Sequence, residues 1–119
     1  MEDCIFCKIV KKEIPGEVEI ETETVLAFRD INPKAPVHIL IIPKKHIENL
    51  ANAAKEDLEI LGSCQLVAKE IAEKNGTEKA FRLLTASGAG AGQTVSHLHY
   101  HLVGGWKDRI PGMEIWRED

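Results

Sequence analysis

Residues 97–103 constrain the fold of this chain more than any other segment, because histidine alternates there with large apolar side chains. A β-strand points successive side chains to opposite faces, so the alternation predicts a strand over 95–103 with a polar face and an apolar face. His97, His99 and His101 share the polar face, with neighbouring side chains about 6–7 Å apart. The apolar face predicts packing against a second layer of structure.

The rest of the pattern predicts an α+β domain, in which a mostly antiparallel sheet carries one long helix on one face. Apolar residues at spacings of three and four predict that helix over 54–74, ended by Asn75 and Gly76. The nearly continuous β-branched run over 37–42 predicts a central strand buried on both faces. The remaining predicted elements are a short helix over 4–13 and strands over 17–21, 24–29 and 80–86.

Length and charge exclude several classes of protein. A chain of 119 residues fits one domain over 1–119. Its 15 basic and 19 acidic residues give a formal charge of −4, which argues against binding to nucleic-acid backbones. No apolar run approaches the ~20 residues that span a bilayer, so we expect no membrane association. The first residues lack the pattern of a secretory signal, and we expect a cytoplasmic protein.

A row of three imidazoles admits three interpretations. The first is an amphipathic strand whose polar face happens to be histidine. The second is a metal site, since two histidines two residues apart on a strand can chelate one ion. The third is phosphoryl or nucleotidyl transfer with an imidazole nucleophile, because histidine has an unperturbed pKa of about 6.5 and exchanges protons readily near neutrality.

The segment before the histidines favours the third interpretation. Residues 87–94 read Ser-Gly-Ala-Gly-Ala-Gly-Gln-Thr, and glycine at positive φ lets successive N–H groups converge on an anion. Thr94 adds a hydroxyl beside them. The loop is not a Walker A motif, because no Gly-Lys-Ser/Thr follows. Placed directly before the histidines, it predicts hydrogen-bond donors for the non-bridging oxygens of a phosphate.

Cys4 and Cys7 have the spacing of two ligands to one tetrahedral zinc ion. A thioredoxin-like redox role is disfavoured, because no strand-turn-helix context surrounds the pair. The alternative is a pair of reduced cysteines on a short helix. Cys64 lies on the apolar stripe of the long helix, and we expect it in the core.

Residues 97–103 match the signature His-φ-His-φ-His-φ-φ, where φ is an apolar residue, and the chain therefore resembles the histidine triad (HIT) family of nucleotide hydrolases and transferases. Segments 4–9, 26–38, 42–47 and 92–95 resemble its histidine triad nucleotide-binding branch. The resemblance implies a HIT-like fold, with a five-stranded sheet, one long helix and a short N-terminal helix. It also implies a homodimer, with the long helix and the strand 80–86 at the interface.

The family pattern implies a role for each histidine. His99 would attack the α-phosphorus of a nucleotide and form a covalent nucleotidyl-imidazole, while a backbone carbonyl near His97 fixes its tautomer. His101 would bind a phosphate oxygen, and His38 would orient the row from the adjacent strand. Thr94 would place a hydroxyl near the leaving group.

The resemblance also implies a purine nucleotide site. Asp30 would accept hydrogen bonds from both ribose hydroxyls; without the resemblance it is equally a turn residue before Asn-Pro. The apolar residues implied at the base would otherwise be routine core residues. The residues implied to surround the nucleotide, besides Asp30, His99 and His101, are Ile5, Phe6, Ile9, Ile31, Leu40, Gln93 and Thr94.

Relatives with paired cysteines complete a zinc site with two histidines, here His46 and His97. The set Cys4, Cys7, His46 and His97 would be a closed structural site. Two features depart from the branch: Ala86 stands where relatives carry a phosphate-holding Asn, and the tail through Trp106 and Trp116 differs from the usual one.

We therefore expect a hydrolase that cleaves purine nucleoside phosphoramidates, of the AMP–amine or AMP–lysine type. Cleavage of dinucleoside polyphosphates is the alternative within the same chemistry. A nucleotide-binding or scaffolding protein with weak catalysis is a second alternative, which Ala86 keeps open. A metal-dependent hydrolase with His97 and His99 as ligands is disfavoured, because few acidic ligands lie near the triad.

Overall fold

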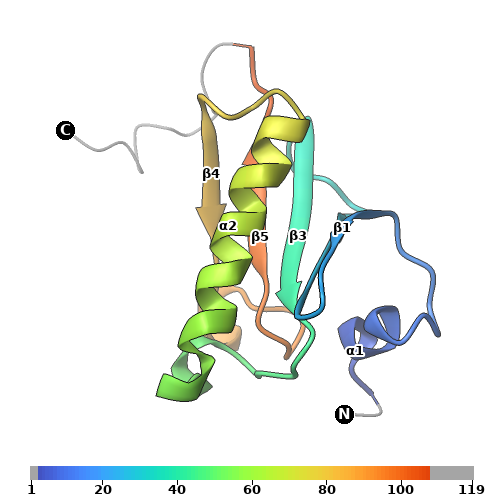
Figure 1. Ribbon diagram of the computed structural model, residues 1–119, viewed down its shortest axis with the longest axis vertical. Coiled ribbons are helices and arrows are strands. Elements are labelled where there is room, and N and C mark those ends of the chain that lie inside the picture. Colours follow the sequence, from blue (N-terminus) through green and yellow to red (C-terminus); the bar gives the residue numbers. More distant parts are fainter. Residues whose placement is uncertain (1–2, 108–119) are drawn as a thin grey trace.

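A five-stranded antiparallel sheet lies at the centre of the structure, a computed structural model that describes residues 3–107. Its strand order is β1-β2-β3-β5-β4, and α2 runs along one face (Figure 1). The predicted α+β fold, with one long and one short helix, is confirmed. The elements are α1 (Ile5–Val10), β1 (Val18–Glu21), β2 (Val25–Arg29), β3 (Val37–Pro43), α2 (Leu58–Lys74), β4 (Phe81–Leu84) and β5 (Tyr100–Gly104).

The two faces of the sheet carry separate apolar clusters, because the side chains of β2 and β3 alternate. Ile39 and Ile41 pack with α2, whereas Leu40 and Ile42 pack with Phe6 of α1 on the opposite face. Strand β3 is thus buried on both faces, as its continuous apolar run predicts. The helix α1 and the histidine side of the sheet share the face that α2 leaves free.

Strand β5 is shorter than the sequence predicts, and this corrects the prediction of a strand over 95–103. The strand begins at Tyr100, and residues 95–99 precede it outside the ladder. The Leu98 N–H donates at 2.6 Å to the carbonyl of Ile47, which lies beyond the end of β3, so this bond is not part of the ladder. The alternation of faces survives, because Leu98, Tyr100 and Leu102 all pack in the cluster beneath α2.

Helix α1 is shorter than predicted at both ends, and α2 begins later than predicted. A 3-10 turn (Lys55–Asp57) precedes α2, where Asp57 Oδ2 accepts the Ala54 N–H at 2.8 Å. Helix α2 ends at Asn75 and Gly76 as predicted, with Gly76 at φ 71°. Helix α1 begins after Cys4, whose sulfur accepts the Cys7 N–H at 3.3 Å. Among residues 3–107, no helix is long and apolar enough to cross a membrane.

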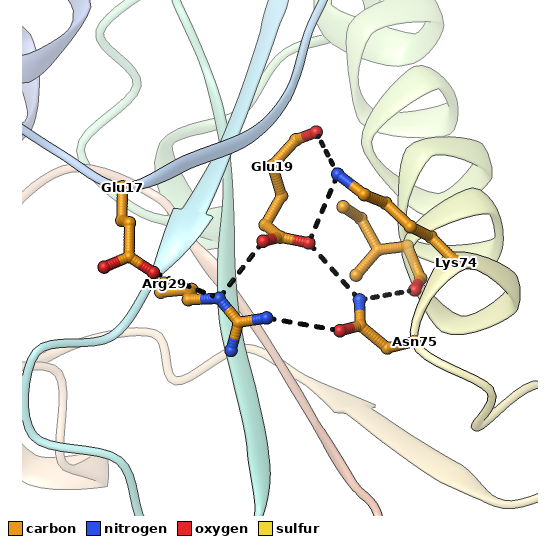
Figure 2. A network of polar contacts seen from close by, with 6 residues as sticks. Glu17, Glu19, Arg29, Lys74 and Asn75 are labelled. Atoms are coloured by element: carbon orange, nitrogen blue, oxygen red, sulfur yellow. Dashed lines mark hydrogen bonds and ion pairs between the residues drawn. The ribbon is translucent and has the colours of Figure 1, made fainter.

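A polar network fastens β1 and β2 to the end of α2 (Figure 2). Glu19 accepts hydrogen bonds from Arg29 Nε at 3.1 Å and from Asn75 Nδ2 at 3.4 Å, and lies 3.5 Å from Lys74 Nζ. Glu17 also lies 3.3 Å from Arg29, but its side chain is 79% exposed against 12% for Glu19. Burial disfavours the charge of Glu19, yet the Asn75 bond and the two cations outweigh it and lower its pKa.

We expect Glu19→Gln to lower the free energy of unfolding by about 1–2 kcal/mol, because three partners lose a buried charge. The lowered pKa means that this contribution is present above the ordinary value of 4.5 and is lost as the pH falls through the folded-state pKa. Urea denaturation at neutral and acidic pH measures both effects. The exposed neighbour supplies the control, since Glu17→Gln should change stability by no more than about 0.5 kcal/mol. Equal effects of the two substitutions would contradict the burial argument.

Candidate active site and metal cluster

A cavity of about 270 Å³ opens on the sheet face that α2 leaves free. It lies between α1, the ends of β2 and β3, and the segment that leads into β5. Most residues implied for the nucleotide site line this cavity. They are Ile5, Phe6, Ile9, Asp30, Ile31, Leu40, Thr94, His99 and His101.

Both the ring and the backbone of His99 are fixed by hydrogen bonds. Its Nδ1 lies 2.7 Å from the carbonyl oxygen of His97, and a carbonyl only accepts, so Nδ1 carries the proton. Neutral His99 therefore has its lone pair on Nε2. The ring packs edge-on to Phe6 with centroids 5.1 Å apart, and Thr85 Oγ1 donates to the His99 carbonyl at 2.8 Å.

His38 and His101 form a second chain of fixed tautomers. The Lys34 N–H donates to His38 Nδ1 at 2.9 Å, which places the proton of neutral His38 on Nε2. His38 Nε2 lies 2.9 Å from His101 Nδ1, which must then accept. His101 keeps its own proton on Nε2, so a residue that lines the cavity supplies an N–H donor.

Burial favours the uncharged form of His38, His97 and His101. Desolvation lowers the pKa of His38 below its ordinary value, against the attraction of the Asp30 carboxylate. Desolvation, with the neighbouring His99 and His38, lowers the pKa of His101 to about 4. The pKa of His97 is also lowered, chiefly by burial. The tautomers assigned to these three histidines are therefore those of neutral rings.

Asp30 forms a turn and also lines the cavity. Its Oδ1 accepts the Asn32 N–H at 2.8 Å, which forms the turn before Pro33. Its Oδ2 lies 3.5 Å from His38 Nε2, and the residue lines the cavity. The carboxylate is 18% exposed and only accepts hydrogen bonds, so it suits a pair of hydroxyl donors.

Three N–H groups of the glycine-rich loop bond within the loop and are therefore not available to an anion. The N–H groups of Ala91, Gly92 and Gln93 donate to carbonyls within the loop, those of Gly88 and Ala89. Gly88 and Gly92 do adopt positive φ, but this closes the loop on itself.

Gln93 is likewise occupied elsewhere. Its side-chain oxygen accepts the Gly88 N–H, and its amide nitrogen donates to the carbonyls of Glu48 and Val95. The structure thus gives Gln93 a role in holding the loop. From this part of the chain, Thr94 and Val95 reach the cavity.

Cys4, Cys7, His46 and His97 come together beside the cavity, with their ligand atoms all within 4.8 Å of one another. His97 Nδ1 lies 3.3 Å from Cys4 Sγ and 3.5 Å from Cys7 Sγ, and His46 Nδ1 lies 3.3 Å from Cys7 Sγ. A tetrahedral zinc ion with ordinary bond lengths separates sulfur and nitrogen ligands by about 3.5 Å. The four donors therefore fit one zinc ion.

The protonation of the cluster also suits a metal. His97 Nε2 lies 2.8 Å from the Pro43 carbonyl and must donate to it, which leaves the Nδ1 lone pair facing the sulfurs. Burial, with the adjacent Cys4, raises the pKa of the Cys7 thiol to about 11, so a thiolate there requires a nearby cation.

Several supporting residues gave no signal in the sequence. The Thr85 hydroxyl and the Pro43 carbonyl each fix a histidine that lies 14 or 54 residues away, and the Lys34 N–H fixes His38 within one turn of chain. Pro43 was visible only as the end of a strand, and backbone groups carry no residue-type signature. Residues 108–119 of the divergent tail, with Trp116, lie outside the part of the chain described.

Comparisons with known proteins agree with this geometry. The family described as "Scavenger mRNA decapping enzyme C-term binding" matches residues 3–113. A HIT-like protein of Synechocystis is 50% identical over 104 residues, which cover 87% of this chain and 91% of the relative. A 14 kDa zinc-binding protein of Zea mays is 52% identical over 103 residues, covering 85% of this chain and 80% of the relative.

The solved structure of a HIT family hydrolase from Clostridium thermocellum superimposes with a TM-score of 0.88 at 48% identity. The match covers 94% of this chain and 98% of that one. Sequence identity at this level over nearly the whole fold, together with the alternating histidines, shows that this chain belongs to the histidine triad (HIT) family.

Proposed function

We propose that this protein is a nucleotide hydrolase that cleaves purine nucleoside phosphoramidates through a nucleotide attached covalently to His99. One observation carries the proposal. The 2.7 Å contact between His99 Nδ1 and the His97 carbonyl leaves an Nε2 lone pair on a residue that lines a cavity with Asp30. The name of the Clostridium thermocellum neighbour, a HIT family hydrolase, supports the general class of activity.

The reaction would proceed in two displacements at phosphorus. His99 Nε2 donates its lone pair to the α-phosphorus, a P–N bond to the ring forms, and the bond to the amine breaks. The amine leaves with the bonding pair and takes up a proton from solvent, to which the attacking water of the second step returns one. Water then attacks the phosphorus, the bond to His99 breaks, and a nucleoside monophosphate is released.

The surroundings of His99 suit both steps. Phosphorylation of Nε2 gives the ring a positive charge, which the Nδ1–H bond to the His97 carbonyl stabilises without further motion. His101, held neutral, offers its Nε2–H to a phosphoryl oxygen, and a neutral donor does not quench the neighbouring nucleophile. Thr94, which lines the cavity, would place its hydroxyl near the leaving amine.

The remaining cavity walls suit a nucleoside. Asp30 would accept hydrogen bonds from the two ribose hydroxyls. The base would lie among apolar side chains of α1, of β3 and of the loop that follows β2. Those named for this role are Ile5, Phe6, Ile9, Ile31 and Leu40, of which Phe6, Ile9 and Leu40 are buried and Ile31 is 90% exposed. An exposed apolar side chain at the rim is suited to cover a bound base.

Zinc would be held by Cys4, Cys7, His46 and His97. Four protein ligands leave no open coordination position, so the ion would supply structure and not a reactive water. The printed name of the Zea mays relative, a zinc-binding protein, supports this assignment.

A homodimer is proposed through α2 and β4. Strand β4 is the last in the sheet order, so its outer edge has no partner strand within the described chain. Large apolar side chains are exposed on both elements, Leu66 at 66% and Leu84 at 47%. Pairing of two β4 edges would join two sheets and cover these side chains.

We expect His99→Ala to lower hydrolysis of an AMP phosphoramidate by at least about 10³-fold while the fold is kept. The variant should also lose the mass increase of one nucleoside monophosphate that the wild type shows after mixing with substrate and quenching in base. Circular dichroism and AMP binding serve as controls for folding. Unchanged turnover would reject His99 as the nucleophile, and faster cleavage of diadenosine polyphosphates than of amides would reject the substrate class.

The neutral state of His101 predicts how stability depends on pH. Its pKa falls from 6.5 to about 4 on folding, so between these values the unfolded chain binds more protons. The free energy of unfolding therefore decreases as the pH falls from 6.5 to 4, and the contribution is complete above 6.5. His101→Gln should flatten this dependence by up to about 1.4 kcal/mol per pH unit in urea titrations. An unaltered slope would show that His101 is not held neutral.

The interface predicts that Leu84→Asp converts the dimer to a monomer, because it places a charge in an apolar contact. Sedimentation velocity measures the change. Val18→Asp is the matched control, since Val18 is 43% exposed on β1 at the opposite edge of the sheet, and it should leave the dimer intact. A wild-type monomer, or dissociation by both variants, would contradict this interface.

A further inference from the structure

The metal cluster and the nucleotide cavity share one structural wall, the helix α1. Cys4 caps the start of α1 and Cys7 lies in its first turn, whereas Phe6 and Ile9 of the same helix line the cavity. The helix has only 6 residues, and helices this short are not stable by themselves in water. Its position therefore depends on the contacts that fasten it to the sheet.

His97 forms a second link between the two sites. Its ring is fully buried, with Nδ1 beside the sulfurs of Cys4 and Cys7 and Nε2 donating to Pro43. Its main-chain carbonyl accepts the proton of His99 Nδ1. A ligand that fixes the His97 ring thus fixes the acceptor that sets the tautomer of His99.

Phe6 connects the same groups by packing. Its ring lies edge-on to His97 at 6.0 Å and to His99 at 5.1 Å between centroids, and edge-on to Phe28 of β2 at 5.5 Å. Movement of α1 away from the cluster would remove this ring from both histidines and open the base side of the cavity.

We propose that zinc held by Cys4, Cys7, His46 and His97 controls nucleotide affinity and the orientation of His99, with His97 as the positioning residue between them. The part that concerns affinity rests on the proposed function. Weak S–H and N–H contacts are all that the four side chains can offer one another, whereas zinc bonds to all four at once. Linkage requires the reverse effect too: a nucleotide that binds the ordered cavity must tighten zinc by the same factor.

His46 gives the sharpest test, because it belongs to the cluster and is not among the residues that line the nucleotide cavity. His46→Gln removes a ligand, whereas His46→Cys replaces it with another zinc ligand. We expect wild type and His46→Cys to bind one zinc per chain and to bind AMP, and His46→Gln to lose zinc and to bind AMP about tenfold or more weakly. Cys64→Ala, which removes a thiol from the core under α2, should keep both properties.

Two readouts are independent of turnover and of nucleotide. The nitrogen resonances of isotopically labelled His99 should show one tautomer in the zinc-loaded protein and a mixture after chelation. Hydrogen exchange of the α1 amides should accelerate on chelation while that of β3 and α2 stays slow. Wild type with and without chelator gives the same comparison if His46→Gln does not fold.

The outcomes separate the two proposals. Equal AMP affinity with and without zinc, or a wild type that binds no zinc, would overturn the control by metal and leave the nucleotide site standing. No AMP binding by the zinc-loaded protein would overturn the proposed function; the His99 resonances and α1 exchange then decide whether the metal still positions these elements. A zinc affinity that AMP does not change would contradict the linkage.

Discussion

The site depends on the hydrogen bond from His99 Nδ1 to the carbonyl oxygen of His97. That carbonyl is available because β5 begins only at Tyr100. Strand β5 lies between β3 and β4, so a longer strand would commit the backbone groups of residues 97–99 to ladder bonds on both sides. Because the strand begins after His99, the His97 carbonyl can orient the His99 ring.

The protons of His38, His97 and His101 are also assigned by backbone groups, either directly or through a neighbouring ring. Pro43 accepts from His97, Lys34 donates to His38, and His38 in turn sets His101. Both nitrogens of His38 are used in this way, whereas His97 keeps a lone pair that can bind a metal and His101 keeps an N–H that can donate to an oxygen. Burial keeps His38, His97 and His101 neutral, so imidazoles crowded together do not repel as cations.

The sequence predicted what depends on local periodicity and little of what depends on distant contacts. Alternation identified both faces of residues 97–103, and Asn75 with Gly76 marked the end of α2. The predicted start of β5 was wrong, because the hydrogen bond from Leu98 to Ile47 joins residues 51 positions apart and local periodicity does not report on such contacts. The glycines indicated that positive φ is accessible in this loop, and Gly88 and Gly92 adopt it, but composition does not indicate where the adjacent N–H groups point.

His97 shows why the role of a residue in a motif cannot be read from loss of activity alone. Its ring belongs to the cluster with Cys4 and Cys7, and its carbonyl belongs to His99. A substitution at His97 removes the ring and keeps the carbonyl, so a loss of turnover would arise indirectly, from the altered position of the backbone or of α1. Placing a metal ligand two residues before a nucleophile joins the stability of the first site to the geometry of the second, because the intervening chain is too short to absorb a displacement.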